Sequence, residues 1–266
     1  MAQVADAVRT VEGIHPSAVV DRGARLGSGV TVGPGSIVEA DVEIGDDTWI
    51  GAHAVIASGT RLGRRNRVYH GAILGTEPQH LGDHGDGTKL IIGDDNVLRE
   101  YCSINRGSAA TGQTTLGNGC YIMMYVHLGH DCRLGNQVIM ANATNVAGHV
   151  DIDDHANISG LVPIHQFVRI GKYTFISGGY RVLKDVPPYI IASEHSSGFC
   201  GLNTVGLQRH GFGKEQISTI KQAYRLLYQE SLNRSQAVTR IKSDLPDTPE
   251  IQEILTFIES SDRGIL

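Results

Sequence analysis

The stretch Leu116-Gly-Asn-Gly-Cys-Tyr-Ile-Met-Met-Tyr-Val-His-Leu-Gly-His-Asp-Cys-Arg-Leu134 decides the fold, because an aliphatic residue returns at every sixth position. The pattern runs without a break through Leu116, Ile122, Leu128, Leu134, Met140, Val146, Ile152, Ile158, Ile164, Ile170, Ile176 and Val182. Neither an α-helix, with a period of about 3.6 residues, nor an alternating strand, with a period of about 2, produces this spacing. A six-residue period is typical of a parallel β-helix, in which each hexapeptide is one short strand and a turn.

The N-terminal half of the chain keeps the same register. It begins at Ile14 and continues through Val20, Leu26, Val32, Val38, Ile44, Ile50, Ile56, Leu62, Val68 and Leu74. Three hexapeptides make one triangular coil, so residues roughly 18 positions apart are predicted to stack on one another. A glycine often follows the aliphatic residue, as at Gly27 and Gly33, where a tight turn requires either a positive φ or a close approach of two backbones.

Two polar insertions, residues 76–89 and 107–114, interrupt the register. Each is predicted either to carry binding residues or to be a tolerated surface excursion. After Val182 the pattern stops at Asp185-Val-Pro-Pro-Tyr189. These prolines are predicted to end the coil, because proline cannot donate a hydrogen bond to the strand ladder.

The C-terminal quarter is predicted to be helical. Residues 190–212 are interpreted as an irregular connection, and residues 213–230 carry apolar side chains at helical spacing. Two shorter helices are expected at 235–245 and 248–260, the last with Thr248 as its cap and Pro249 at its first position. We therefore expect an N-terminal extension at 1–13, a β-helix at 14–189, and a connection with a helical domain at 190–266.

Composition excludes several classes of protein. The chain has 266 residues and a formal net charge of −5, with a pI near 6.2, which gives no case for nucleic-acid binding. No apolar run approaches the roughly 18 residues of a transmembrane segment. The first residues do not read as a secretory signal. A cytoplasmic protein is expected.

The four cysteines, Cys102, Cys120, Cys132 and Cys200, form no CxxC pair. The first three occupy the fifth position of the hexapeptide, which elsewhere carries small residues such as Ala54. Buried structural thiols are therefore favoured over disulfides or a metal site.

Four histidines interrupt the mostly polar outward positions: His127, His130, His149 and His165. A single outward histidine is usually an ordinary surface residue. Four within neighbouring coils, with His130 followed directly by Asp131, indicate a catalytic site, because histidine titrates nearest to neutral pH.

The chain resembles the UDP-N-acetylglucosamine acyltransferase family of lipid A biosynthesis in five motifs. These are YVHLGHDC (125–132), NVAGHV (145–150), IHQFVRIG (164–171), DVPPY (185–189) and GLQRHGF (206–212). The resemblance extends from about Ile14 to Leu266. It implies an all-β left-handed parallel β-helix with a C-terminal α-helical domain, assembled as a homotrimer. The implied reaction is the first step of lipid A biosynthesis, transfer of a 3-hydroxyacyl chain from acyl carrier protein to the 3-hydroxyl of UDP-N-acetylglucosamine.

By this resemblance three residues carry the catalysis. His130 matches the family's general base, and Asp131 matches the carboxylate that orients the base and stabilises its cation. The backbone N–H of Gly148 matches the donor that stabilises the oxyanion of the tetrahedral intermediate. No cofactor and no metal is expected.

The resemblance also implies the substrate contacts. Asn203 and Arg209 match residues that hold the nucleotide and its phosphates, where a guanidinium is apt. Gly178 matches the residue at which the acyl tail stops. The remaining substrate-binding residues that we expect are His127, His149, His165 and Gln166.

The chain departs from the family pattern at the acceptor site. His80 and Gly82 stand where the family usually has a carboxylate and a lysine, Val205 replaces a Glu, and His210 replaces a second basic residue beside Arg209. The catalytic core is intact. The acceptor is therefore expected to be a UDP-amino sugar, bound with altered contacts.

The sequence is also compatible with three alternatives. The first is a related hexapeptide acyltransferase with a different nucleotide-sugar acceptor. The second is a γ-class carbonic anhydrase, which needs three His ligands to zinc in another spacing than that of His127 and His130. The third is a trimer that kept the scaffold without catalysis.

Overall fold

The computed structural model describes residues 13–194, 198–228 and 230–266. The expected N-terminal extension therefore lies outside the described residues, apart from Gly13. The chain divides into two compact units, residues 1–133 and 134–266, and each is described by itself.

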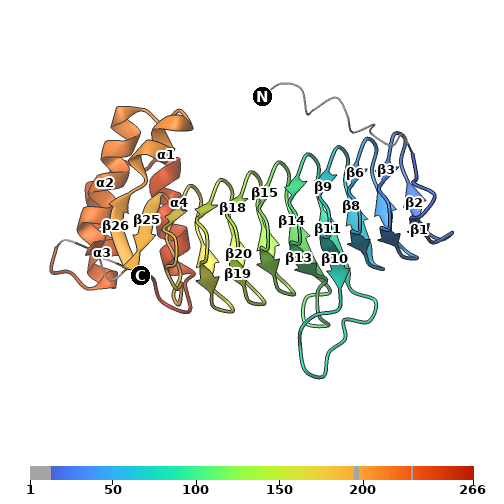
Figure 1. The fold of residues 1–266 in the computed structure, drawn as a ribbon. Coiled ribbons are helices and arrows are strands. Elements are labelled where there is room, and N and C mark those ends of the chain that lie inside the picture. Colours follow the sequence, from blue (N-terminus) through green and yellow to red (C-terminus); the bar gives the residue numbers. More distant parts are fainter. Residues whose placement is uncertain (1–12, 195–197, 229) are drawn as a thin grey trace. The chain divides into compact units, whose positions relative to one another are not determined.

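The first unit consists of three parallel sheets built from successive coils (Figure 1). The first sheet contains β1 (Val19–Val20), β4 (Ile37–Val38), β7 (Val55–Ile56), β10 (Ile73–Thr76), β13 (Ser103–Asn105) and β16 (His127–Leu128). The second contains β2 (Arg25–Leu26), β5 (Glu43–Ile44), β8 (Thr60–Leu62), β11 (Lys89–Ile92) and β14 (Gln113–Leu116). The third contains β3 (Thr31–Val32), β6 (Trp49–Ile50), β9 (Arg67–Val68), β12 (Val97–Leu98) and β15 (Tyr121–Ile122).

The strand register confirms the predicted stacking. Val19 pairs with Ile37, and Ile37 pairs with Val55, so that contacts recur at a separation of 18 residues. Across the first insertion Ile73 pairs with Ser103, and across the second Ser103 pairs with His127. The extra residues thus leave the coil and return to it with the strands still paired, and the register shifts only between Leu74 and Thr76 of β10.

The aliphatic residues that recur at every sixth position, here called the aliphatic ladder, form the core of the first unit. Ile50, Ile56, Leu74 and Leu98 are completely buried, and each such side chain contributes about 1.5–3 kcal/mol through its burial. Cys102, Cys120 and Cys132 lie buried beside the ladder, as expected for structural thiols, whereas Cys200 in the second unit is exposed. Burial raises the pKa of the Cys102 thiol to about 12.

The turns have a left-handed residue at the third position after the ladder residue. Asp47, Tyr125 and Asp131 have φ values of 57°, 60° and 60°. The glycine directly after the ladder serves a different purpose, since a Cβ on Gly33 would lie 2.7 Å from the carbonyl carbon of Gly51. Of the two reasons predicted for this glycine, close backbone approach is the one that applies at Gly33.

Parallel strands also make up the coils of the second unit. β19 (Asn145–Val146) pairs with β22 (Pro163–Ile164), and β20 (Asp151–Ile152) pairs with β23 (Arg169–Ile170). A third sheet has the order β18 (Ile139–Met140), β21 (Asn157–Ile158), β24 (Phe175–Ile176), β25 (Ile190–Ser193) and β26 (Gly198–Leu202).

Two expectations for the end of the coils are wrong. Residues 190–212 are not irregular, because they contain β25, β26 and the short helix α1 (Thr204–Arg209). The two prolines also do not end the pairing, since β25 runs parallel to β24 beyond them. Val186 and Tyr189, which flank the prolines, supply the N–H donors, to the carbonyl oxygens of Arg169 and Lys172.

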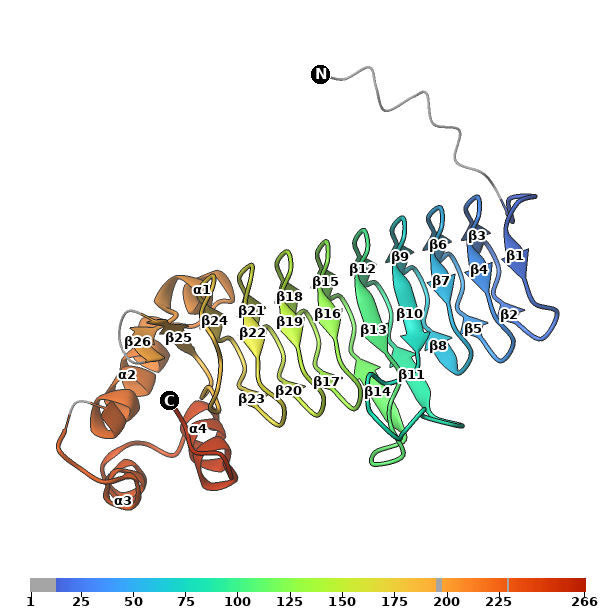
Figure 2. The same cartoon turned by 60° about the horizontal axis from the view of Figure 1, so that its bottom comes forward.

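The three predicted C-terminal helices are present as α2 (Lys214–Tyr228), α3 (Arg234–Asp244) and α4 (Pro249–Glu259) (Figure 2). Thr248 caps α4 by accepting a hydrogen bond from Ile251, with Pro249 at the start of the helix, as expected. On α2, Tyr224 is buried, and its hydroxyl donates to the carbonyl of Pro188 at 2.6 Å. No helix in the described ranges combines the length and the apolar character needed to cross a bilayer.

Candidate active site

His130 and Asp131 lie in the turn that follows β16 and form a buried pair. The Nδ1 atom of His130 is 2.6 Å from Oδ2 of Asp131, and the two residues are 9% and 7% exposed. A carboxylate only accepts hydrogen bonds, so Nδ1 carries the proton. The other ring nitrogen, Nε2, is then the basic atom of the neutral imidazole.

The second insertion holds the carboxylate of Asp131. Ser108 donates to it from its backbone N–H at 3.0 Å and from its hydroxyl at 2.6 Å, and the hydroxyl of Thr111 also donates to it. Burial alone would raise the pKa of Asp131, but the hydrogen bonds from Ser108, Thr111 and His130 outweigh burial and lower it to about 2. Asp131 is therefore ionised at neutral pH. Sequence reasoning missed Ser108 and Thr111, although an insertion rich in hydroxyl side chains was the available signal.

The first insertion brings His80 to the same place. The rings of His80 and His130 meet edge to face, with their centroids 5.6 Å apart. Asp83 anchors this insertion, because its carboxylate accepts from the N–H of Gly85 at 2.8 Å and of Ala109 at 2.9 Å. These two hydrogen bonds lower the pKa of Asp83. Both insertions therefore support the turn that carries His130.

His127 lies on β16, three residues before His130. Its Nδ1 atom is 2.8 Å from the hydroxyl of Ser103 on the neighbouring strand β13. Burial, and then the nearby His130, lower the pKa of His127. The structure of the first unit thus brings His80 and His127 close to His130, which itself pairs with Asp131.

The second unit carries the other predicted residues. His149 occupies the left-handed turn position after β19, with φ of 60°, and its ring stacks on Phe167 at 4.6 Å. The carbonyl of the preceding Gly148 accepts a hydrogen bond from the N–H of Phe167 at 3.3 Å. Gly148 and His149 therefore lie in one well-defined turn.

His165, Gln166 and Gly178 are exposed residues of the second unit. Arg263 places its Nη2 atom 3.2 Å from Nδ1 of His165 and 3.3 Å from the carbonyl of Leu183. The same Nδ1 atom also lies 3.1 Å from the carbonyl oxygen of Gln166. The C-terminal tail, through Arg263, thus fixes the orientation of His165.

Asn203, Arg209 and His210 line a cavity of about 440 Å³ in the second unit. Asn203 is the cap of α1: its Oδ1 atom accepts from the N–H of Gly206 at 3.1 Å, and its amide donates to the carbonyl of Tyr173 at 2.9 Å. Asn203 therefore fixes α1 to the coil. The same cavity contains His155 and Tyr173, which the sequence did not single out.

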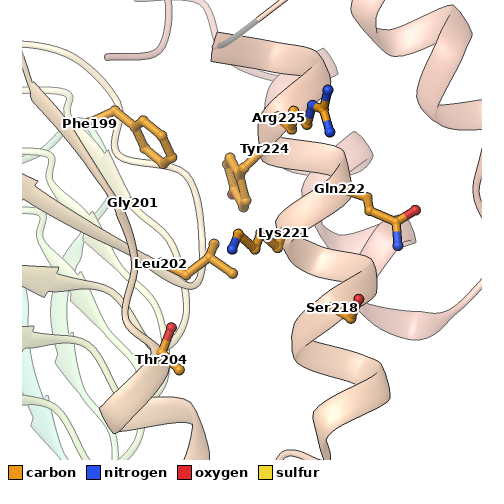
Figure 3. A pocket seen from close by; sticks show the side chains of 9 residues that line it. All are labelled: Phe199, Gly201, Leu202, Thr204, Ser218, Lys221, Gln222, Tyr224 and Arg225. Carbon is orange, nitrogen blue, oxygen red and sulfur yellow. The ribbon is translucent and has the colours of Figure 1, made fainter.

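A second cavity, of about 380 Å³, lies between β26 and α2 (Figure 3). Phe199, Leu202 and Tyr224 line it, together with Lys221 and Arg225 of α2. None of the predicted catalytic or substrate-binding residues is in this cavity.

Stacked hexapeptide coils with a buried His–Asp pair in one turn define a hexapeptide-repeat transferase. The family model of the bacterial transferase hexapeptide, six repeats, matches residues 41–76. A second family model, UDP N-acetylglucosamine O-acyltransferase domain 2, matches residues 185–266.

Curated relatives match along nearly the whole chain. The acyl-[acyl-carrier-protein]–UDP-N-acetylglucosamine O-acyltransferase of Halorhodospira halophila is 46% identical over 254 residues, covering 95% of this chain and 98% of that protein. The protein of the same name from Myxococcus xanthus is 44% identical over 253 residues, again with 95% and 98% covered. A crystal structure of the UDP-N-acetylglucosamine acyltransferase from Bacteroides fragilis has a TM-score of 0.93 and 43% identity, covering 95% of this chain and 99% of that one.

The chain belongs to the UDP-N-acetylglucosamine O-acyltransferase family. Its fold class is the predicted one, an all-β left-handed parallel β-helix with C-terminal helices.

Proposed function

We propose that this enzyme transfers a 3-hydroxyacyl chain from acyl carrier protein to the 3-hydroxyl of UDP-N-acetylglucosamine, the first step of lipid A biosynthesis. The curated relatives at 40–46% identity carry the name of this reaction. The observation that carries the proposal is the contact between Nδ1 of His130 and the ionised carboxylate of Asp131. Such a pair gives a general base with a defined tautomer.

In the proposed mechanism, Nε2 of His130 accepts the proton of the sugar hydroxyl as its oxygen attacks the thioester carbonyl. Asp131 stabilises the imidazolium that forms, as the Asp of a Ser-His-Asp triad does. The C–O bond forms, the C–S bond breaks, and the proton passes from the imidazolium to the departing sulfur. General-base catalysis of this kind contributes about 10²- to 10⁴-fold to the rate.

The N–H of Gly148 is proposed to stabilise the oxyanion, a contribution of about 10²- to 10³-fold. His127, His149, His165 and Gln166 are proposed to position the substrates. The neutral state that burial favours in His127 suits it to hydrogen bonding with a sugar hydroxyl.

Arg209 is proposed to bind the nucleotide phosphates, and Asn203 to place α1 at the pocket. Gly178 is proposed as the position at which the acyl tail stops. These assignments rest on the matching motifs and on the cavity that Asn203 and Arg209 line.

The acceptor contacts differ from the family pattern in the first insertion. Asp83 supplies a carboxylate three residues after His80, but Gly85 and Ala109 already bind both of its oxygens. We therefore propose that the ring of His80, beside His130, contacts the amino sugar instead of a carboxylate.

We also propose that the enzyme is a cytoplasmic homotrimer with its sites between subunits. An apolar stripe on the first sheet supports an interface between copies. Its exposed side chains are Val19, Ile37 and Ile73, which are 63%, 41% and 39% exposed. They lie in register on neighbouring strands, with Val55 between Ile37 and Ile73. Apolar area of this kind is commonly covered by a partner.

An acyl-transfer assay with a panel of UDP-sugars and acylated carrier proteins tests the function. We expect ester formation with UDP-N-acetylglucosamine and loss of turnover in His130→Ala. Turnover with another UDP-sugar alone would favour the related acyltransferase with a different acceptor. Binding without turnover of any acceptor would favour a non-catalytic trimer, and carbon dioxide hydration with bound zinc would favour an anhydrase.

A further inference from the structure

Two carboxylates hold consecutive N–H groups of the second insertion. The N–H of Ser108 donates to Oδ1 of Asp131 at 3.0 Å, and the N–H of the next residue, Ala109, donates to Oδ2 of Asp83 at 2.9 Å. One carboxylate belongs to the turn that carries His130, and the other belongs to the first insertion. Because the two N–H groups belong to adjacent residues joined by planar peptide units, a displacement of one also displaces the other.

The side chain of Ser108 connects this segment to the proposed general base. Its hydroxyl donates to Oδ2 of Asp131 at 2.6 Å, and the same oxygen lies 2.6 Å from Nδ1 of His130. Ser108 and Asp131 are both buried, so the loss of this contact would leave buried polar groups unsatisfied. A shift of Ser108 therefore changes the contacts of the oxygen that orients the imidazole.

Gly85 is the point at which the first insertion is fastened. Its N–H donates to Oδ1 of Asp83 at 2.8 Å, and its carbonyl accepts from Nε of Arg106 at 3.0 Å. The hydroxyl of Thr88 lies 2.6 Å from the same carbonyl and 2.5 Å from that of Gly107 in the second insertion. Gly85 has φ of 66°, and a Cβ here would lie 2.6 Å from the carbonyl oxygen of Gly107. Glycine is therefore required where the two insertions meet.

Asp83 is ionised at neutral pH. The N–H groups of Gly85 and then of Ala109 lower its pKa, and the nearby carboxylate of Asp131 opposes them by repulsion. Hydrogen bonds to an ionised carboxylate are about twice as strong as those between neutral groups. The contact between Asp83 and Ala109 is therefore a strong link between the two insertions.

We propose that Asp83 is a positioning residue for the reaction. It holds Ala109, and through Ala109 it keeps Ser108 against Asp131, so that His130 stays oriented for proton transfer. The inference rests on the proposed acyl transfer. It gives the first insertion a part in the rate of the chemical step, in addition to the contact with the acceptor that is proposed for His80.

Asp83→Asn tests the proposal, because the amide keeps the size of the side chain but has only one acceptor oxygen. Gly85 or Ala109 then loses its acceptor. With both substrates at saturating concentrations, we expect kcat to fall about 10-fold. Asp86→Asn is the matched control, since it removes the same charge from an exposed position in the same insertion, and it should leave kcat unchanged.

A double-mutant cycle separates positioning from a general loss of structure. In the Asp131→Asn background the carboxylate that Ser108 holds is already gone. Adding Asp83→Asn to that background should therefore lower kcat by less than about 2-fold. An equal effect of Asp83→Asn in both backgrounds would overturn the proposal, and so would an unchanged kcat in the single variant.

Hydrogen–deuterium exchange follows the second insertion without any substrate. The amides of Ser108 and Ala109 should exchange at least about 10-fold faster in Asp83→Asn than in the wild-type protein. Exchange in the coils should stay the same, because the aliphatic ladder is untouched. Unchanged exchange at both amides would show that Asp83 does not hold the segment.

The wild-type protein separates this inference from the proposed function. If the wild type transfers the acyl chain and Asp83→Asn matches its kcat, the role of Asp83 is wrong and the proposed function stands. If the wild type transfers no acyl chain to UDP-N-acetylglucosamine, the proposed function fails, and the role of Asp83 in that reaction fails with it.

Discussion

Ser108 donates two hydrogen bonds to the carboxylate of Asp131, from its backbone N–H at 3.0 Å and from its hydroxyl at 2.6 Å. Ser108 belongs to the second insertion, and Asp131 to the turn after β16. The second insertion therefore holds the carboxylate of Asp131, the residue that orients His130, in a fixed position. An arrangement of this kind fixes the imidazole before substrate arrives, which lowers the reorganisation needed during reaction.

Replacement of His130 by Ala should lower kcat by about 10²- to 10⁴-fold, because the general base is lost. The fold should remain, since the side chain lies in a turn outside the aliphatic ladder. Asp131→Asn should cost less, because it disturbs the orientation and charge of the base without removing it. Steady-state rates at saturating substrate measure both effects, and near-normal kcat in His130→Ala would disprove the mechanism.

Asp131→Asn should also lower the free energy of unfolding, by about 2 kcal/mol at pH 7. The folded pKa of Asp131 is lowered from 3.8 to about 2. Its contribution is therefore fully present above the unfolded value and is lost as the pH falls from about 4 towards 2. Urea unfolding of the two proteins at pH 7 and at about pH 3 measures the difference. A difference that does not shrink in acid would contradict this origin.

His80→Ala should raise KM for UDP-N-acetylglucosamine by about 3- to 10-fold, the effect of losing one hydrogen bond. His84→Ala is the matched control, because His84 lies in the same insertion and pairs only loosely with Glu77, at 3.5 Å. Equal kinetics in the two variants would show that the altered insertion does not recognise the acceptor.

Gly178→Met should shorten the preferred acyl chain by filling the end of the groove. The backbone tolerates the change, since a Cβ at this position would lie 3.4 Å from the carbonyl of Gly160 and 3.8 Å from Ser159. Competition between acyl carrier proteins of different chain length gives the profile, with thermal unfolding as the check on folding. An unchanged chain-length profile would exclude Gly178 as the position at which the acyl tail stops.

Ile37→Lys should weaken the proposed trimer, because it places a charge in the centre of the apolar stripe. Light scattering across a range of protein concentrations measures the mass. Ser28→Lys, which adds the same charge to an exposed turn, should leave the mass unchanged. A stable and active monomer in the wild-type protein would end the proposal.

The fold was predictable because the spacing of aliphatic residues along the sequence specifies it. Twelve aliphatic residues at six-residue spacing, from Leu116 to Val182, can be buried together only in stacked coils. The helices α2, α3 and α4 carry their own apolar spacing, and Asn233 and Thr248 cap α3 and α4. The domain boundary expected near residue 190 stays a prediction. Its neighbourhood was misjudged because β25 and β26 lie beyond the six-residue repeat and form through pairing, β25 with β24 and β26 with β25.

The residues of the candidate site likewise divide into those that the sequence indicated and those that only the tertiary structure brought together. The sequence by itself determined that His130 and Asp131 share a turn, since they are adjacent and the period places them after β16. It also singled out the altered residues His80 and His210. Only the tertiary structure brought Ser108 to Asp131, His80 to His130 and His155 to His210, because each contact joins segments whose separation the period does not specify. The two insertions and the segment after the coils lie outside the six-residue repeat. The positions of their side chains therefore follow from packing and hydrogen bonding rather than from local spacing.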